Sequence, residues 1–135
     1  MTGAAHDLAR RFFAALSAGA FPDGLLADEI TTWTTTSGPA SDKARYEGGV
    51  KLLSSLFPRG LPYTVDSLTA EDDRVAAEVH AEGTLANGEL FQNRYAFVLR
   101  IKHGRIASIA EHFDPGPVRE KIVPLLMAAM AKPAS

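Results

Sequence analysis

One carboxylate of this chain, that of Glu111, lies at a position that suits general acid/base chemistry. Glu111 lies in a β-type segment, and the alternation of a strand places it on the same face as Ile109 and Phe113. If those two apolar side chains point into the core, Glu111 does too, and a carboxylate among apolar walls has a raised pKa suited to proton transfer. The alternative is a charged residue on the outer face. We take Glu111 as the candidate catalytic residue.

His80 is the candidate catalytic partner of Glu111. It precedes Glu82 by two positions, so a strand would present both side chains on one face. A His beside a carboxylate titrates near neutral pH, which suits acid/base work. The opposite phase, with Val79 and Ala81, is the apolar one, and plain amphipathicity would send His80 to solvent. Both placements are compatible with the sequence.

Large and polar side chains are expected to line a pocket around this carboxylate. Tyr95 offers a hydroxyl donor, and Asn93, two residues earlier, shares its face. Tyr46 either reaches the pocket mouth or only packs against its own helix, and Trp33 either lines the pocket or fills the core. The other residues expected on the pocket wall are Phe12, Phe97, Ile109 and Phe113.

The composition excludes several classes of protein. The absence of Cys removes thiol nucleophiles, Cys-ligated zinc and iron–sulfur clusters, and the four His lack the spacing of a metal site, so we expect neither metal nor cofactor. Fourteen basic and sixteen acidic residues are scattered along the chain, so we expect no nucleic acid partner. No apolar stretch approaches the ~20 residues of a bilayer span, and we expect no membrane partner and a soluble, cytoplasmic protein.

The first half of the chain has helical patterns around one strand. Apolar residues at helical spacing predict helices over 6–18 and 46–57. Between them, residues 25–28 predict a short helical turn and the Thr-rich run 30–36 predicts a strand. The length of 135 residues fits a single domain over 1–135.

The second half has the pattern of an antiparallel meander. The turn dipeptides Asn87-Gly88 and His103-Gly104 are typical of hairpins. The third strand is long enough to predict a bend or bulge. A final helix is predicted over 118–130, kinked at Pro124. The four predicted strands are 63–70, 74–85, 90–101 and 105–114.

Helices followed by a meander predict an α+β fold. We expect a curved antiparallel sheet forming a cone, packed by N-terminal helices, with a C-terminal helical tail. Such a cone encloses a pocket where helices cover its open side, and we expect an apolar small-molecule ligand there. The outer sheet face carries Ala96 and Val98 in one phase. That apolar surface predicts a homodimer.

Four segments resemble a known family: residues 11–16 followed by Gly19, then 46–48, 93–98 and 104–114. Together they resemble the SnoaL-like, ketosteroid-isomerase-like branch of the nuclear transport factor two-like superfamily, over nearly the whole chain. The resemblance implies the α+β cone and its pocket. The superfamily includes ketosteroid isomerases, polyketide cyclases, limonene epoxide hydrolases and scytalone dehydratases, beside members that only bind or assemble, so the resemblance does not fix a reaction.

The isomerase residues are missing from the matching positions. The resemblance places Phe12 at the position of the helix Tyr and Thr35 at that of the base. The strand Asp falls near Ala96 or Phe97. The steroid-isomerase mechanism is therefore not expected.

Two other chemistries of the family make smaller demands. In the epoxide-hydrolase pattern Glu111 stands at the position of the water-activating carboxylate, with His80 in place of an Arg and Glu82 as the second acid. A SnoaL-type cyclase needs only one carboxylate in an apolar pocket. The resemblance implies carboxylate acid/base chemistry (isomerase, cyclase, dehydratase or epoxide-hydrolase-like) on an apolar, oxygen-bearing substrate. The alternative is a non-catalytic hydrophobic-ligand-binding or dimeric accessory protein.

Overall fold

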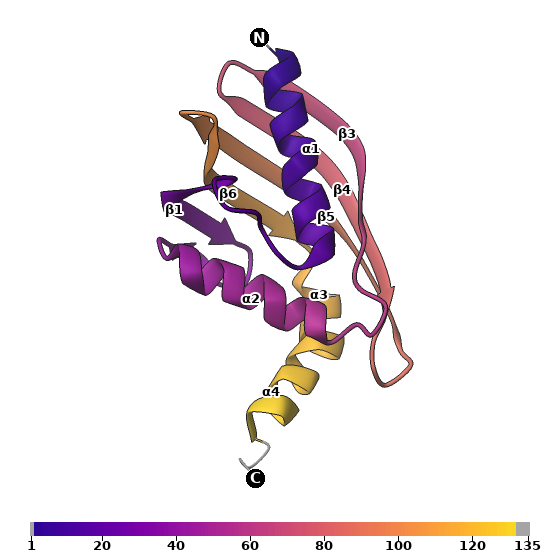
Figure 1. The fold of residues 1–135 in the computed structure, drawn as a ribbon. Helices are drawn as coiled ribbons and strands as arrows, with labels where there is room; N and C mark the ends of the chain where they lie inside the picture. Colours follow the sequence, from indigo (N-terminus) through magenta and orange to yellow (C-terminus); the bar gives the residue numbers. More distant parts are fainter. Residues whose placement is uncertain (1, 132–135) are drawn as a thin grey trace.

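A computed structural model describes residues 2–131, in which helices pack on the concave face of one curved, open sheet (Figure 1). The predicted α+β cone with a C-terminal helix is confirmed. The elements are α1 (Thr2–Ala18), β1 (Leu26–Thr34), β2 (Gly38–Ala40), α2 (Lys43–Ser55), β3 (Tyr63–Glu71), β4 (Arg74–Thr84), β5 (Leu90–Lys102), β6 (Arg105–Phe113), α3 (Pro115–Pro117), the π-helix η1 (Val118–Ile122) and α4 (Val123–Ala131).

The six strands lie in the order β2-β1-β6-β5-β4-β3. Strands β3 to β6 form the predicted antiparallel meander, but β1 pairs with β6 in parallel, so the sheet is mixed rather than wholly antiparallel. The helical turn predicted over residues 25–28 is wrong. Leu26 already pairs with Ile106, and the carbonyl of Leu25 accepts a hydrogen bond from the Ile106 amide, because the neighbouring strand offers this segment ladder partners.

Hairpin turns and bulges shape the meander. His103 and Gly104 both have positive φ, 53° and 73°, which matches the twist of a tight hairpin between β5 and β6. The β5–β6 pair shifts register between Arg100 and Ile101, at the end of the long strand rather than in its middle. Such irregularities increase the local twist and help the sheet to curl.

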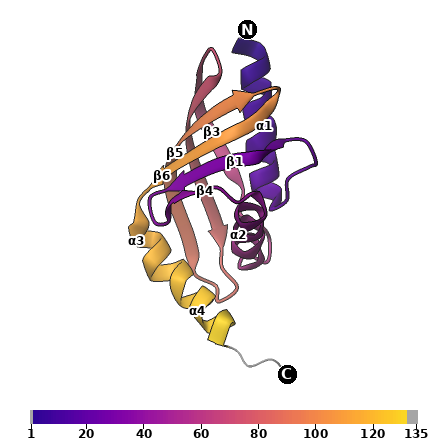
Figure 2. The ribbon, with the colours of Figure 1, turned by 90° about the vertical axis from the view of Figure 1, so that its left-hand side faces the viewer.

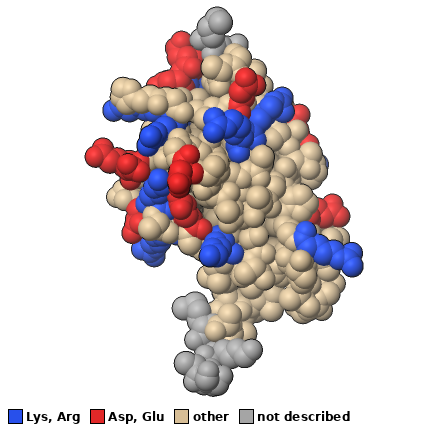
Figure 3. Space-filling view, in the orientation of Figure 1, with Lys and Arg blue, Asp and Glu red and all other residues tan. Residues whose placement is uncertain are grey.

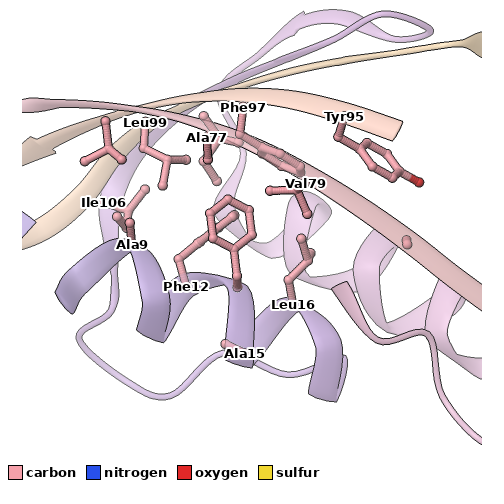
Figure 4. Packing of buried hydrophobic residues seen from close by; sticks show 14 of the residues in the cluster. Ala9, Phe12, Ala15, Leu16, Ala77, Val79, Tyr95, Phe97, Leu99 and Ile106 are labelled. Atoms are coloured by element: carbon pink, nitrogen blue, oxygen red, sulfur yellow. The ribbon is translucent and has the colours of Figure 1, made fainter. Parts of the chain in front are cut away.

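Helix α1 seals one half of the concave face. Phe12 and Phe13 meet Phe97 of β5 edge to face, with ring centroids 6.0 and 5.0 Å apart. Figure 4 shows Phe12 and Leu16 pointing from α1 towards the sheet residues that complete this cluster. Burying each such side chain stabilises the fold by about 1.5–3 kcal/mol. This half of the cone is a filled core.

The chain after β6 forms the predicted C-terminal helix, in which α3, η1 and α4 follow one another without a gap. Asp114 begins it, because its carboxylate accepts the Gly116 amide at 2.9 Å. Pro124 has no N–H to donate, and the π-helix with its altered hydrogen-bond pattern lies directly before it, near the predicted kink. Figures 1 and 2 show α4 running away from the body of the cone.

The surface gives no sign of a one-signed binding patch on the face that carries α1 and α2. Figure 3 shows Lys and Arg side chains interspersed with Asp and Glu on this face. Among residues 2–131, none of the helices combines the length and the apolar character that a bilayer span requires.

Candidate functional site

A cavity of about 400 Å³ lies between the concave face of the sheet, α2 and the tail. This volume is in the range of small-molecule sites. A hollow of about 510 Å³ at the start of α1, lined in part by Asp7, Arg11 and Asp72, is wider open to solvent and would bury less of a ligand. We therefore place the candidate site in the first cavity. Its apolar wall includes Leu16, Val50, Leu53, Phe91, Phe113, Val118, Ile122 and Leu126, and its polar wall includes Thr32, Thr34, Tyr46, Tyr63, Tyr95 and Glu111.

Strand register brings Glu111 to the cavity. Glu111 pairs with Phe97 on β5 and with Thr34 on β1, and directly paired residues share a face of the sheet. Thr35 then fixes the backbone that directly follows the Glu111 side chain. Its amide donates to the Glu111 carbonyl at 3.1 Å, and its hydroxyl accepts the Phe113 amide at 3.0 Å. The side chain of Glu111 is thus held on a rigid, doubly paired strand.

The carboxylate of Glu111 has no hydrogen bond or ion pair to another described side chain. Burial raises its pKa from 4.5 to about 7, because desolvation disfavours the charged form. The side chain keeps part of its accessible surface, and it lines the cavity. Near neutral pH, Glu111 is therefore present in both protonation states, which is what a group that takes and returns protons requires.

Three tyrosines from three different elements stand around this carboxylate. Burial is the main cause that raises the pKa of Tyr46, Tyr63 and Tyr95, and the charge of Glu111 raises each further. All three phenols therefore stay protonated and act as donors. The rings of Tyr63 and Tyr95 lie 5.5 Å apart. The buried hydroxyl of Tyr46 has no partner within residues 2–131.

His80 does not join Glu111. It pairs in register with Arg94 on the outer face of the sheet, and its Nδ1 lies 2.8 Å from a carboxylate oxygen of Asp66. Glu82 is exposed in the same phase of β4. The sheet separates both residues from the cavity, because the apolar phase of β4 faces inward as amphipathicity indicated.

Trp33 lies neither in the cavity nor in the core. It pairs with Ala110, and its ring lies 4.6 Å from that of His112, on the outer face. The register between β1 and β6 turns Thr32 and Thr34 inward instead. An alternation of Thr with a single Trp does not indicate which side chains of a strand are buried. The sequence therefore left open whether Trp33 or its Thr neighbours face inward.

Asn93 anchors the tail instead of facing a ligand. Its side-chain amide donates to the Asp114 carbonyl at 3.0 Å, and its oxygen accepts the Arg94 amide at 3.0 Å. Of the other residues expected on the pocket wall, Phe12, Phe97 and Ile109 belong to the filled core, whereas Tyr46, Tyr95 and Phe113 do line the cavity.

Sequence reasoning missed several wall residues. Phe91 shares the phase of Tyr95 in β5, so strand alternation was a signal for it. Val118, Ile122 and Leu126 have helical spacing on one face, but no sequence signal shows where the tail docks. Tyr63 opens a strand and gave no signal of its own. Within residues 2–131, no three His, Asp or Glu side chains are grouped so that they would hold a metal ion.

Comparison with protein families matches residues 9–109 to the SnoaL-like domain. This protein belongs to the SnoaL-like family. The matched span ends before Glu111, so the family match carries the fold and says nothing of that carboxylate. A comparison of this SnoaL-like chain with curated protein sequences found no match.

Solved structures share the fold of this SnoaL-like protein at low identity. An NTF2-like protein from Anabaena variabilis is 24% identical with a TM-score of 0.73, over 84% of this chain and 88% of that one. IdmH from Streptomyces antibioticus, provisionally described as a polyketide cyclase, is 18% identical with a TM-score of 0.73, over 87% and 96%. An LEH-like epoxide hydrolase from M. tuberculosis is 16% identical with a TM-score of 0.72, over 93% and 97%.

Proposed function

We propose that this protein binds an apolar, oxygen-bearing small molecule in the cavity and that Glu111 acts on it as a general acid and base. The observation that carries the proposal is the carboxylate of Glu111, which has no partner within residues 2–131 and lies in a cavity with a mostly apolar wall. Burial raises its pKa to about 7. General acid/base catalysis is most efficient when the pKa of the group lies near the working pH.

Proton transfer beside a carbonyl group fits the cavity better than epoxide hydrolysis does. It needs one base and a donor for the carbonyl oxygen, and the cavity offers Glu111 together with tyrosine hydroxyls. Epoxide hydrolysis of the limonene type would need the donor and second acid expected at His80 and Glu82, which face away. The similar solved structures include proteins described as a polyketide cyclase and an epoxide hydrolase, and they support the pocket by analogy of fold.

Exchange of substrate protons with deuterium tests this proposal. Cyclic and aromatic ketones are incubated in D₂O with wild type or Glu111→Gln, and exchange beside the carbonyl is followed by NMR. We expect at least one ketone to exchange faster with wild type, and the variant to lose roughly 10²- to 10⁴-fold of that rate. Glu82→Gln, which changes an exposed carboxylate on the outer face, is the matched control and keeps the wild-type rate. Equal rates for wild type and Glu111→Gln would remove the catalytic role.

The alternative is ligand binding without chemistry, and the apolar wall formed by Leu53, Ile122 and Leu126 favours it. Under this alternative wild type and Glu111→Gln bind a fluorescent apolar probe alike, and neither accelerates exchange. The two functions therefore differ in one measurement on the same pair of proteins.

A homodimer through the outer sheet face remains our prediction, for a protein that we expect in the cytoplasm. Strand register aligns Trp33, Ala110, Val98 and Ala76 in one apolar row across four strands. Such a row is a self-complementary surface for a two-fold partner. Light scattering on wild type should give twice the 14.4 kDa chain mass, and Val98→Glu should give the single chain. A wild-type monomer would refute the dimer.

A further inference from the structure

The hydroxyl of Tyr46 is a buried donor whose use the fold does not explain. Its oxygen is closed off from solvent and makes no hydrogen bond within residues 2–131, although the side chain lines the cavity. Leaving a buried donor unpaired costs about 1–3 kcal/mol, so native proteins seldom keep one without a reason. Phenylalanine would fill the same space without that cost. The hydroxyl therefore calls for a partner that comes from outside the fold.

The ring of Tyr46 is held in place by a chain of aromatic contacts. It packs on Phe21 with centroids 5.7 Å apart, and Phe21 stacks on Phe12 of the filled core, also at 5.7 Å. Phe12 in turn meets Phe97 on β5. A donor that is fixed in this way loses little freedom when a ligand arrives, which favours selective binding.

The other two phenols of the cavity lie close to one another. The rings of Tyr63 and Tyr95 are 5.5 Å apart. The backbone of Tyr63 is held by Ser17, whose hydroxyl accepts the Tyr63 amide at 2.8 Å. Of the three phenols, Tyr46 is the one whose oxygen is buried without a hydrogen-bond partner within residues 2–131.

The position of Tyr46 relative to Glu111 limits what the partner is. Tyr46 and Glu111 both line the cavity, yet no hydrogen bond joins them. A phenol that stays protonated offers a donor, and the matching group is an acceptor oxygen. The apolar wall and the aromatic rings nearby require that this oxygen be carried on a hydrophobic frame.

We propose that Tyr46 binds the carbonyl oxygen of an aromatic or alicyclic ketone, and so selects ligands that place this oxygen beside Glu111. The proposal rests on the proposed function, because it assigns a ligand class to the same cavity. Tyr46 is a specificity-determining residue: a ligand without the oxygen leaves the phenol unpaired. The site then discriminates against an isosteric hydrocarbon more strongly than hydrophobic contacts alone would.

A cycle of two ligands and two proteins tests this assignment. The ligands are 2-acetylnaphthalene and 2-isopropenylnaphthalene, in which a C=CH₂ group replaces the C=O group on the same frame. Fluorescence titration gives the four dissociation constants with wild type and Tyr46→Phe. The ratio of ratios cancels the different hydrophobicity of the two ligands. We expect wild type to prefer the ketone by a factor roughly 5 to 30 times greater than Tyr46→Phe does, as the loss of one hydrogen bond to a buried donor implies.

Glu82→Gln is the control, since Glu82 is exposed on the outer face of the sheet and lies outside the cavity. We expect its ratio to stay close to that of wild type. Equal ratios in wild type and Tyr46→Phe, with both ligands bound, would overturn the role of Tyr46 and leave the proposed function intact. Failure of both ligands to bind wild type would contradict the assignment of the cavity as the binding site. Both proposals would then fail.

A further measurement distinguishes two roles of Tyr46, binding a ligand and holding the Glu111 carboxylate. If Tyr46 served only to hold the carboxylate, removing its hydroxyl would raise the pKa of Glu111 in the free protein. That pKa is followed by ¹³C NMR of the Glu carboxyl carbons. We expect it to be unchanged in Tyr46→Phe, and a rise together with an unchanged ligand ratio contradicts the proposal.

Discussion

Helices α1 and α2 cover the same concave face, but they are bound to it in different ways. Helix α1 buries Leu8, Phe12, Phe13 and Leu16 against the sheet, whereas α2 has no buried residue. Helix α2 instead presents Tyr46, Val50 and Leu53 to a cavity. One helix supplies stability and the other leaves space.

The inward-facing strand residues change with the helices above them. In β1, Ile30 in the core gives way to Thr32 and Thr34, and in β6, Ile109 gives way to Glu111. Thr34 and Glu111 lie at the same level of neighbouring strands because the register pairs them directly. A filled core at one end of the cone thus supports a reactive carboxylate at the other, and stability and chemistry are separated along the same strands.

The largest effect that this contrast predicts is on stability, and it is tested by truncating one side chain in each helix. We expect Phe12→Ala to lower the free energy of unfolding by about 3–5 kcal/mol, because it opens a cavity in a filled core. Leu53→Ala on α2 removes a partly buried side chain from a wall that already borders empty space, and should cost about 1 kcal/mol. Urea unfolding measures both. Equal losses would mean that α2 contributes to the core as α1 does.

The pH dependence of stability sharpens the contrast at Glu111. Its pKa is raised in the folded protein from 4.5 to about 7, so the folded state binds the proton more tightly than the unfolded state. Stability is therefore lost as the pH rises from about 4.5 to 7, and the loss persists above. We expect Glu111→Gln to match wild type at acidic pH and to exceed its unfolding free energy above neutral pH by roughly 1–2 kcal/mol, allowing for partial exposure of the side chain.

Urea unfolding across this pH range measures the difference between Glu111→Gln and wild type. Glu82→Gln controls for the loss of one negative charge from the surface. A stability difference that does not change with pH would show that Glu111 has the same pKa in the folded and unfolded states. That result would contradict its assignment to a buried, apolar environment.

The tail depends on Asn93, which gives the next prediction. Asn93→Ala removes the hydrogen bonds to the Asp114 carbonyl and the Arg94 amide, and should cost about 1 kcal/mol. It should also weaken binding of an apolar probe, because Ile122 and Leu126 lose their anchor over the cavity. His80→Ala removes an exposed pair on the other face and serves as the control. Unchanged probe binding in Asn93→Ala would show that the tail is held by other contacts.

The smallest expected effect is a gain of stability in α2. Gly49 lies inside the helix, and a Cβ added there meets no atom within 4 Å. Gly49→Ala should therefore raise the unfolding free energy by about 0.5 kcal/mol through helix propensity. Since Gly49 also lines the cavity, the new methyl group should weaken binding of bulky probes. A loss of stability would mean that α2 packs more closely than its exposure indicates.

The fold was largely predictable from the sequence, and the site only in part. Periodicity and turn residues predicted all four strands of the meander and both long helices, because these signals are local. The register of β1 on β6 is not local, and it decided that Trp33 faces outward while Thr32 and Thr34 face the cavity. His80 was misplaced where chemistry was weighed against the amphipathic pattern, and the pattern was the better guide.

The tail has a consequence for the order in which the protein is made. The carboxylate at position 111 and the strand that carries it leave the ribosome before Ile122 and Leu126, which close the cavity from the far side. A nascent chain that has emerged only as far as Asp114 has its sheet and its acid but no finished chamber. The part of the cavity wall that Ile122 and Leu126 supply is therefore synthesised after the reactive group.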